Sequence, residues 1–219
     1  MAGTKKATVF VVDDDASMRR SLRRLLQLSG YAVEEFASAG DFLQREKPSG
    51  TGCLLLDVRM PRMNGPELFD RMAQSGYSLP VIFLTGHGDV PTSVHAMKDG
   101  AVDFLLKPVD AEVLLPAIRD ALDRHAARQA QETSKAAIHA RLSALSPRER
   151  EVMEHVVRGE PNKLIAASLG ISEKTVKVHR HRVMEKMDAG SLADLVRLAD
   201  AAASRASEGR ARPRRGRAG

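Results

Sequence analysis

The sequence of 219 residues is poor in cysteine and in aromatic side chains. Its one cysteine, Cys53, lies in a short apolar run, so a disulfide framework and a cysteine-based zinc site are excluded. It has no Trp, 2 Tyr and 6 Phe, which argues against an aromatic-lined cofactor pocket or a base-stacking platform. No apolar stretch approaches the ~18 residues of a membrane span, and the first apolar run stops at three aspartates, too soon for a signal peptide. We therefore expect a cytoplasmic protein with no membrane partner.

Charge is distributed unevenly along the chain. Residues 1–122 carry 14 Lys and Arg against 16 Asp and Glu, whereas residues 123–219 carry 20 against 12, so the two parts are expected to have different partners. Six arginines lie in 201–219, which we expect to be a disordered basic tail. Residues 123–141 are rich in Ala, Gln and Arg and offer only Ile138 as a large aliphatic side chain, so they predict a helical linker.

Five short apolar runs alternate with helical patterns in the first part of the chain. The runs are Thr8–Val12, Ala32–Phe36, Cys53–Leu56, Pro80–Leu84 and Val102–Leu106, and helices are predicted to begin after Ser17, Ser38, Pro66, Pro91 and Asp110. Continuous apolar strands that alternate with helices predict a doubly wound parallel sheet, covered on both faces and connected by right-handed crossovers. The fold class is therefore α/β, and sites are expected at the carboxyl ends of the strands.

The residues at those strand ends form a specific set. They are Asp13 and Asp14 after the first strand, Asp57 after the third, Thr85 after the fourth and Lys107 after the fifth. Three carboxylates brought together repel one another unless a divalent cation that prefers hard oxygen ligands lies among them, and Mg²⁺ is the obvious candidate. With a lysine and a hydroxyl beside them, the set fits a carboxylate nucleophile that accepts a phosphoryl group.

The motifs around these residues resemble the receiver domain of bacterial response regulators. They read Val-Val-Asp-Asp-Asp, Leu-Leu-Leu-Asp-Val-Arg-Met-Pro, Phe-Leu-Thr-Gly-His-Gly-Asp-Val-Pro and Asp-Phe-Leu-Leu-Lys-Pro, within residues 7–122. The resemblance implies a five-stranded flavodoxin-like domain over 1–122 with Asp57 as phospho-acceptor. It also implies a metal site formed by Asp13, Asp14, Asp57 and the Arg59 carbonyl, a cis Lys107–Pro108 bond, phosphoryl contacts from Lys107 and Thr85, and a switch aromatic at Phe104. Dimer contacts are implied near Val94, Lys98 and Asp103.

The second part of the chain contains the signals of a helix-turn-helix. Ser146-Pro147-Arg148-Glu149 combines an N-cap, a proline at the first helical position and a capping-box glutamate, so it predicts a helix over 147–158 that ends at Gly159. A short helix should end at Gly170, and a third should run from the cap Ser172 to Met187. On that third helix the residues separate into a packing face and a reading face. Val176, Val183 and Met187 share the first, while Lys174, Lys177, Val178 and His181 share the second.

Residues 142–200 resemble the DNA-binding domain shared by the NarL, FixJ and LuxR proteins. The matching motifs are Leu-Ser-Pro-Arg-Glu-Arg-Glu, Pro-Asn-Lys-Leu-Ile-Ala, Leu-Gly-Ile-Ser and Thr-Val-Lys-Val-His-Arg-His-Arg-Val-Met-Glu-Lys-Met. Pro-Asn-Lys, together with Thr-Gly-His-Gly-Asp-Val in the first part, makes FixJ-like regulators the most similar branch. The resemblance implies base contacts from Lys177, Val178 and His181, with Lys174 beside them. It implies backbone contacts from Asn162, Lys163, Ser172 and Thr175.

Together these features predict a DNA-binding transcriptional response regulator and no separate catalytic domain. A sensor histidine kinase would phosphorylate Asp57, which loses the group by self-hydrolysis. The phosphorylated receiver would form a homodimer on double-stranded promoter DNA and meet RNA polymerase directly. Two alternatives remain: a phosphohydrolase of the haloacid-dehalogenase type with Asp13 as nucleophile, and a small-molecule-sensing member of the same DNA-binding family. The first lacks its acidic fourth motif, and the second lacks an aromatic ligand pocket.

Overall fold

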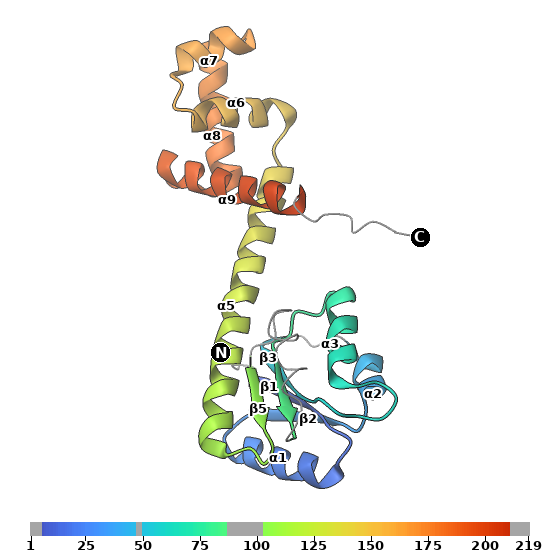
Figure 1. Cartoon of the computed structure of the whole chain (residues 1–219). Helices are drawn as coiled ribbons and strands as arrows, with labels where there is room; N and C mark the ends of the chain where they lie inside the picture. Colours follow the sequence, from blue (N-terminus) through green and yellow to red (C-terminus); the bar gives the residue numbers. More distant parts are fainter. Residues whose placement is uncertain (1–5, 47–49, 87–102, 211–219) are drawn as a thin grey trace, which may run out of the picture. The chain divides into compact units, whose positions relative to one another are not determined.

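The computed structural model describes residues 6–46, 50–86 and 103–210, and the chain divides into two compact units, Met1–Gln129 and Ala130–Gly219. The first unit contains a five-stranded parallel sheet of order β2-β1-β3-β4-β5 (Figure 1). Its strands are β1 (Thr8–Val12), β2 (Ala32–Phe36), β3 (Gly52–Asp57), β4 (Val81–Thr85) and β5 (Asp103–Leu106). The predicted doubly wound α/β class is therefore confirmed, and each of the five strands lies within one or two residues of its predicted limits.

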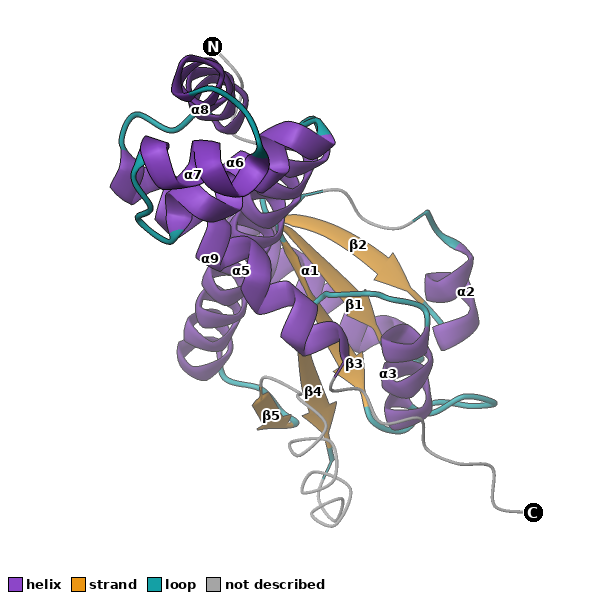
Figure 2. Cartoon of the chain, turned by 90° about the horizontal axis from the view of Figure 1, so that it is seen from above, coloured by secondary structure: helices purple, strands orange, loops and turns teal. Residues whose placement is uncertain are grey.

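Helices cover both faces of this sheet, as Figure 2 shows. The helices α1 (Ala16–Leu28) and α5 (Ala111–Ser143) lie on one face, and α2 (Ala39–Gln44) and α3 (Gly65–Gln74) lie on the other. Alternate residues of β1 point to opposite faces: Val9 and Val11 pack toward α1 and α5, and Phe10 and Val12 toward α2 and α3. Because both faces are buried, the strands are apolar throughout, which is why their sequence signal is a continuous run.

The helix starts follow from capping side chains. The Asp15 carboxylate accepts the backbone N–H groups of Ser17 and Met18, so α1 begins slightly earlier than predicted. Ser38 caps α2 as predicted, and Asn64 forms a capping box with Glu67 before α3. The helix predicted to begin after Pro91 lies outside the described residues.

Helix α5 has 33 residues and includes the whole segment that was predicted to be a helical linker. It continues without a break through residues 123–141, and residues 123–129 belong to the first unit. His125 is buried, and its Nδ1 accepts a hydrogen bond of 3.0 Å from the backbone N–H of Gly52. Gln129 donates to the Gly50 carbonyl at 3.1 Å. Polar contacts with the loop before β3 therefore hold a stretch that has few large aliphatic residues.

The second unit contains four further helices in the part of the chain that the structure describes. They are α6 (Pro147–Val157), α7 (Asn162–Leu169), α8 (Glu173–Met187) and α9 (Leu192–Arg210). The three helices of the predicted helix-turn-helix are confirmed, including the capping box at Ser146 and the left-handed Gly170 that ends α7 at φ 66°. Helix α9 reaches Arg210, so the prediction of disorder is wrong over 201–210. The run Ala201-Ala202-Ala203 explains this difference, because alanine is the strongest helix former.

Candidate functional site

The acidic residues meet where β1 and β3 end side by side in the sheet. These strands are paired in register, so Asp13 and Asp14 directly after β1 lie next to Asp57, the last residue of β3. One carboxylate oxygen from each of the three residues lies within 4.8 Å of the others. Asp13 is 0% and Asp57 6% exposed, whereas Asp14 is exposed. The structure thus brings together the three carboxylates that were predicted from the strand ends.

Lys107 joins this cluster from the end of β5. Its Nζ lies 2.7 Å from Asp13 Oδ2 and 2.8 Å from Asp57 Oδ1, so one ammonium group bridges two buried carboxylates. The peptide bond to Pro108 is cis, as the resemblance implied. The lysine therefore neutralises part of the acidic charge, while Asp14 stays open to solvent.

Burial and charge oppose each other at Asp57 and Lys107. Burial raises the pKa of Asp57, and the hydrogen bond from Lys107 only partly offsets this effect. At Lys107, burial favours the neutral amine, but the hydrogen bonds to Asp13 and Asp57 outweigh it and raise the pKa of the lysine. Lys107 is therefore charged at neutral pH, and Asp57 is a carboxylate whose ionised form is held in an unfavourable environment.

The loop after β3 presses closely on Asp57. Gly65, the first residue of α3, lies so near that a Cβ there would be 2.4 Å from the backbone carbonyl oxygen of Asp57. The backbone N–H of Arg59 bonds to the Asp57 carboxylate, and the Arg59 side chain is exposed. Only glycine permits this approach, and the sequence pattern did not single it out.

Thr85 and Phe104 occupy the neighbouring strands. Thr85 ends β4, is buried, and donates its hydroxyl to the Gly86 carbonyl at 3.2 Å. Phe104 on β5 stacks on Phe83 of β4, with ring centroids 4.7 Å apart and planes 15° from parallel. Phe104 is part of the packed core beside the acidic edge. Of the three predicted dimer contacts, Val94 and Lys98 lie outside the described residues, while the Asp103 carboxylate accepts the N–H of Phe104 at 2.8 Å.

The donor set fits a divalent cation. Three carboxylates with oxygens within 4.8 Å of one another are the hard oxygen ligands that Mg²⁺ prefers, and Asp14 is exposed to solvent. Receiver domains in general bind Mg²⁺ at such an acidic cluster. The Arg59 carbonyl belongs to the loop directly after β3, beside these ligands.

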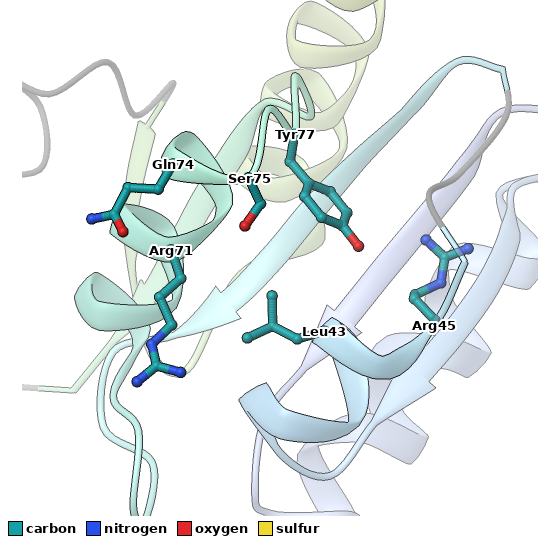
Figure 3. Close-up of a pocket in the computed structure, with 6 residues that line it drawn as sticks. All are labelled: Leu43, Arg45, Arg71, Gln74, Ser75 and Tyr77. Carbon is teal, nitrogen blue, oxygen red and sulfur yellow. The ribbon is translucent and has the colours of Figure 1, made fainter.

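A separate hollow of about 460 Å³ lies between α2 and α3 (Figure 3). It is lined by Leu43, Arg45, Arg71, Gln74, Ser75 and Tyr77. In Figure 3, Leu43 lies between the side chains of Arg71 and Arg45. None of the acidic residues lines it, so this hollow is distinct from the candidate site.

Helix α8 has the two faces that its sequence predicted. Val176, Val183 and Met187 are at most 1% exposed and pack against α6, α7 and α9. The reading-face residues Lys174, Lys177, Val178 and His181 are all exposed, and even the apolar Val178 is 46% exposed. An exposed valine among basic residues suits contact with a base edge, such as a thymine methyl group.

The residues predicted to hold the DNA backbone lie at the starts of α7 and α8. Lys163 and Ser172 are exposed, and Ser172 caps α8 by accepting the N–H of Thr175 at 3.1 Å. The side chain of Asn162 already makes one contact within the protein, because its Oδ1 accepts a hydrogen bond of 3.0 Å from Arg180. Its amide NH₂ group remains the part that can donate to a phosphate.

Sequence reasoning missed an ion pair between a buried glutamate and Lys186 of α8. Glu149 is 3% exposed and lies 2.6 Å from Lys186 Nζ, while it also accepts the backbone N–H of Ser146. These contacts, led by the Lys186 hydrogen bond, lower the pKa of Glu149 from 4.5 to about 2. The capping box predicted the bond to Ser146, but the partner 37 residues away carries no local signal.

Both units match known families over the expected residues. Residues 9–119 match the response regulator receiver domain, and residues 143–199 match the bacterial regulatory proteins of the luxR family. The chain is 47% identical over 195 residues to nodulation protein W of Bradyrhizobium diazoefficiens, covering 89% of this chain and 86% of that protein. It is 48% identical over 191 residues to transcriptional regulatory protein FixJ of Azorhizobium caulinodans, covering 87% and 90%.

Solved structures of response regulators are similar to this chain over most of its length. The response regulator StyR is similar with a TM-score of 0.85 and 46% identity, covering 89% of this chain and 98% of that one. Full-length FixJ from B. japonicum is similar with a TM-score of 0.57 and 45% identity, covering 92% and 98%.

A receiver fold with an acidic strand edge, followed by a helix-turn-helix, defines a two-component response regulator rather than a classical enzyme. The chain belongs to the FixJ-like response regulators, which carry a LuxR-type DNA-binding domain. The alternative of a haloacid-dehalogenase-type phosphohydrolase is not supported. Among the described residues, no helix is both long and apolar enough to cross a membrane.

Proposed function

We propose that a sensor histidine kinase transfers a phosphoryl group to Asp57, and that this modification controls binding to promoter DNA. The observation that carries the proposal is the bridge from Lys107 to Asp13 and Asp57 at 2.7 and 2.8 Å beside the exposed Asp14. A candidate nucleophile, a lysine ammonium group and two further carboxylates lie at a single edge open to solvent, and this arrangement supports the proposal.

In the transfer, an Asp57 carboxylate oxygen attacks phosphorus, a P–O bond forms and the P–N bond of the donor phosphohistidine breaks. The histidine leaves with the electron pair of that bond and takes up a proton from solvent. Asp13, Asp14, Asp57 and the Arg59 carbonyl would hold Mg²⁺, which would neutralise negative charge on the phosphoryl oxygens. Lys107 and the Thr85 hydroxyl hold the other oxygens. Attack of water on phosphorus later breaks the P–O bond to Asp57, which restores the carboxylate and releases inorganic phosphate.

Phosphorylation replaces the single negative charge of the Asp57 carboxylate with a group that carries about −2 and three acceptor oxygens. Lys107 must then divide its contacts between Asp13 and the phosphoryl group. Thr85 is drawn toward the same group, and Phe104 repacks against Phe83. This change favours pairing of two receivers through the surface that includes Val94, Lys98 and Asp103.

The C-terminal unit reads the promoter through α8. The reading-face residues, Lys174, Lys177, Val178 and His181, contact bases and phosphates in the major groove, and Asn162, Lys163, Ser172 and Thr175 hold the backbone. A two-fold dimer presents two such helices about one turn, ~34 Å, apart. The bound dimer contacts RNA polymerase directly, and the protein works in the cytoplasm. Residues 123–141 link the receiver (1–122) to the DNA-binding domain (142–200).

Two experiments test these assignments. Mass spectrometry after treatment with acetyl phosphate and Mg²⁺ should show one adduct on the parent and none on Asp57→Asn; an adduct that survives this substitution sinks the assignment. In DNA binding, Lys177→Ala should reduce discrimination between promoter and random sequence. Lys163→Ala should instead weaken both and lower the log–log salt slope by about 1.

A further inference from the structure

Arg19 of α1 is tied to the acidic edge through its side chain. Its Nη1 donates to the backbone carbonyl oxygen of Asp13 at 2.6 Å, a short charge-assisted hydrogen bond. The other arginines of α1 differ: Arg20 contacts Ser17 at 3.1 Å, Arg23 contacts Glu35 at 3.5 Å, and Arg24 is exposed. Arg19 is half-buried, so its contact is shielded from solvent more than theirs.

The carbonyl that Arg19 holds belongs to the peptide group that joins Asp13 to Asp14. Because this group is planar, fixing the carbonyl oxygen also fixes the nitrogen of Asp14 and restricts the direction of its side chain. Both carboxylate oxygens of Asp13 are already engaged, Oδ1 by the N–H of Asp15 at 2.9 Å and Oδ2 by Lys107. Asp14 is exposed, and no hydrogen bond to its carboxylate is found within the described residues.

We infer that Arg19 is a positioning residue for the divalent cation: it orients the Asp13–Asp14 peptide so that the Asp14 carboxylate points at the ion. This inference rests on the proposed function, because it concerns the same cation site. The Arg19 bond goes to a backbone carbonyl and uses none of the three carboxylates, so Arg19 does not compete with the cation for them.

Charge and geometry predict opposite outcomes when Arg19 is replaced. Removal of a positive charge near a cation site would by itself tighten cation binding. Loss of an outer-shell contact that orients a ligand typically costs 10–100-fold in metal affinity. The sign of the change therefore distinguishes a positioning role from a purely electrostatic one.

The experiment measures Mn²⁺ binding to the full-length protein by the electron paramagnetic resonance signal of the free ion, with Mg²⁺ as competitor. The variants are Arg19→Met, Arg19→Lys and Arg24→Met, the last of which removes the same charge from an exposed position on the same helix. We expect Arg19→Met to bind Mn²⁺ about 10-fold or more weakly. Arg19→Lys should restore part of the loss, and Arg24→Met should match the parent.

Thermal melting followed by circular dichroism identifies any variant that fails to fold. If Arg19→Met does not fold, the Mn²⁺ affinity of Arg19→Lys is compared with that of Arg24→Met instead. The inference is overturned if the folded Arg19 variants bind Mn²⁺ as tightly as Arg24→Met, or more tightly. A parent protein that binds no Mn²⁺ and forms no Asp57 adduct would overturn the proposed function as well. If the parent binds Mn²⁺ and forms the Asp57 adduct, but the Arg19 variants bind Mn²⁺ as Arg24→Met does, only this inference is overturned.

Discussion

The two units each bury a carboxylate beside a lysine, but with opposite electrostatic results. Asp57 in the receiver lies 2.8 Å from Lys107, and burial nevertheless raises its pKa. Glu149 in the DNA-binding unit lies 2.6 Å from Lys186, and its pKa falls to about 2. At Asp57, burial and the neighbouring Asp13 outweigh the contacts from Lys107 and the Arg59 N–H, whereas at Glu149 the contacts from Lys186 and Ser146 outweigh burial. A carboxylate whose contacts outweigh the cost of burial stabilises a fold, and one whose ionised form is kept in an unfavourable environment stays available for chemistry.

The largest loss of stability is expected from a substitution in the core of the C-terminal unit, on the buried face of α8. Met187 is 0% exposed, so Met187→Ala should destabilise the C-terminal unit by ~2–5 kcal/mol. Val178→Ala, on the exposed face of the same helix, should change stability by less than about 0.5 kcal/mol and reduce promoter affinity. Urea denaturation followed by circular dichroism measures the first effect, and DNA binding measures the second. Equal destabilisation by both substitutions would contradict the two-face description of α8.

A smaller effect is expected at the glycine that contacts Asp57. In Gly65→Ala the new Cβ meets the Asp57 carbonyl at 2.4 Å, so the backbone must move, at a cost of ~1–3 kcal/mol. The same shift should weaken Mn²⁺ binding and slow phosphorylation. Gly40→Ala is the matched control, because the added Cβ meets only Ser38 Oγ at 3.6 Å. If the two alanine variants behave alike, close packing at Gly65 is irrelevant to the site.

These cases show which parts of the molecule were predictable. Strand ends and caps have local signals, so Asp57, Lys107 and the Ser146 box followed from neighbouring residues and a parallel sheet order. Contacts between distant segments have no such signal: His125 with Gly52 is separated by 73 residues and Lys186 with Glu149 by 37. The contact of His125 could not be predicted from the sequence, because a histidine in an Ala- and Arg-rich stretch gives no local signal for the distant backbone N–H that it accepts.

The pH dependence of the C-terminal unit should follow Glu149. Its folded pKa is depressed, so its contribution to stability is present above the ordinary value of 4.5 and is lost as pH falls toward about 2. Glu149→Gln should lower stability at neutral pH and flatten the pH profile below about 5. Urea midpoints at several pH values test this, with exposed Glu151→Gln as control. A Gln variant that loses stability in acid as steeply as the parent would exclude Glu149 as the cause.

The smallest change in stability is expected at Asp57, where the dependence on pH has the opposite sign to that of Glu149. Because its folded pKa is raised, its contribution is fully present below the unfolded pKa, where the group is protonated, and is lost as pH rises through the folded pKa. Asp57→Asn should therefore raise the melting temperature of the receiver at neutral pH, and the difference should shrink toward pH ~4, near the ordinary pKa of an aspartate. Exposed Asp70→Asn is the control, with no comparable gain expected. If Asp57→Asn instead melts lower than the parent at neutral pH, the Lys107 contact outweighs burial, and Asp57 is a structural carboxylate of the Glu149 kind.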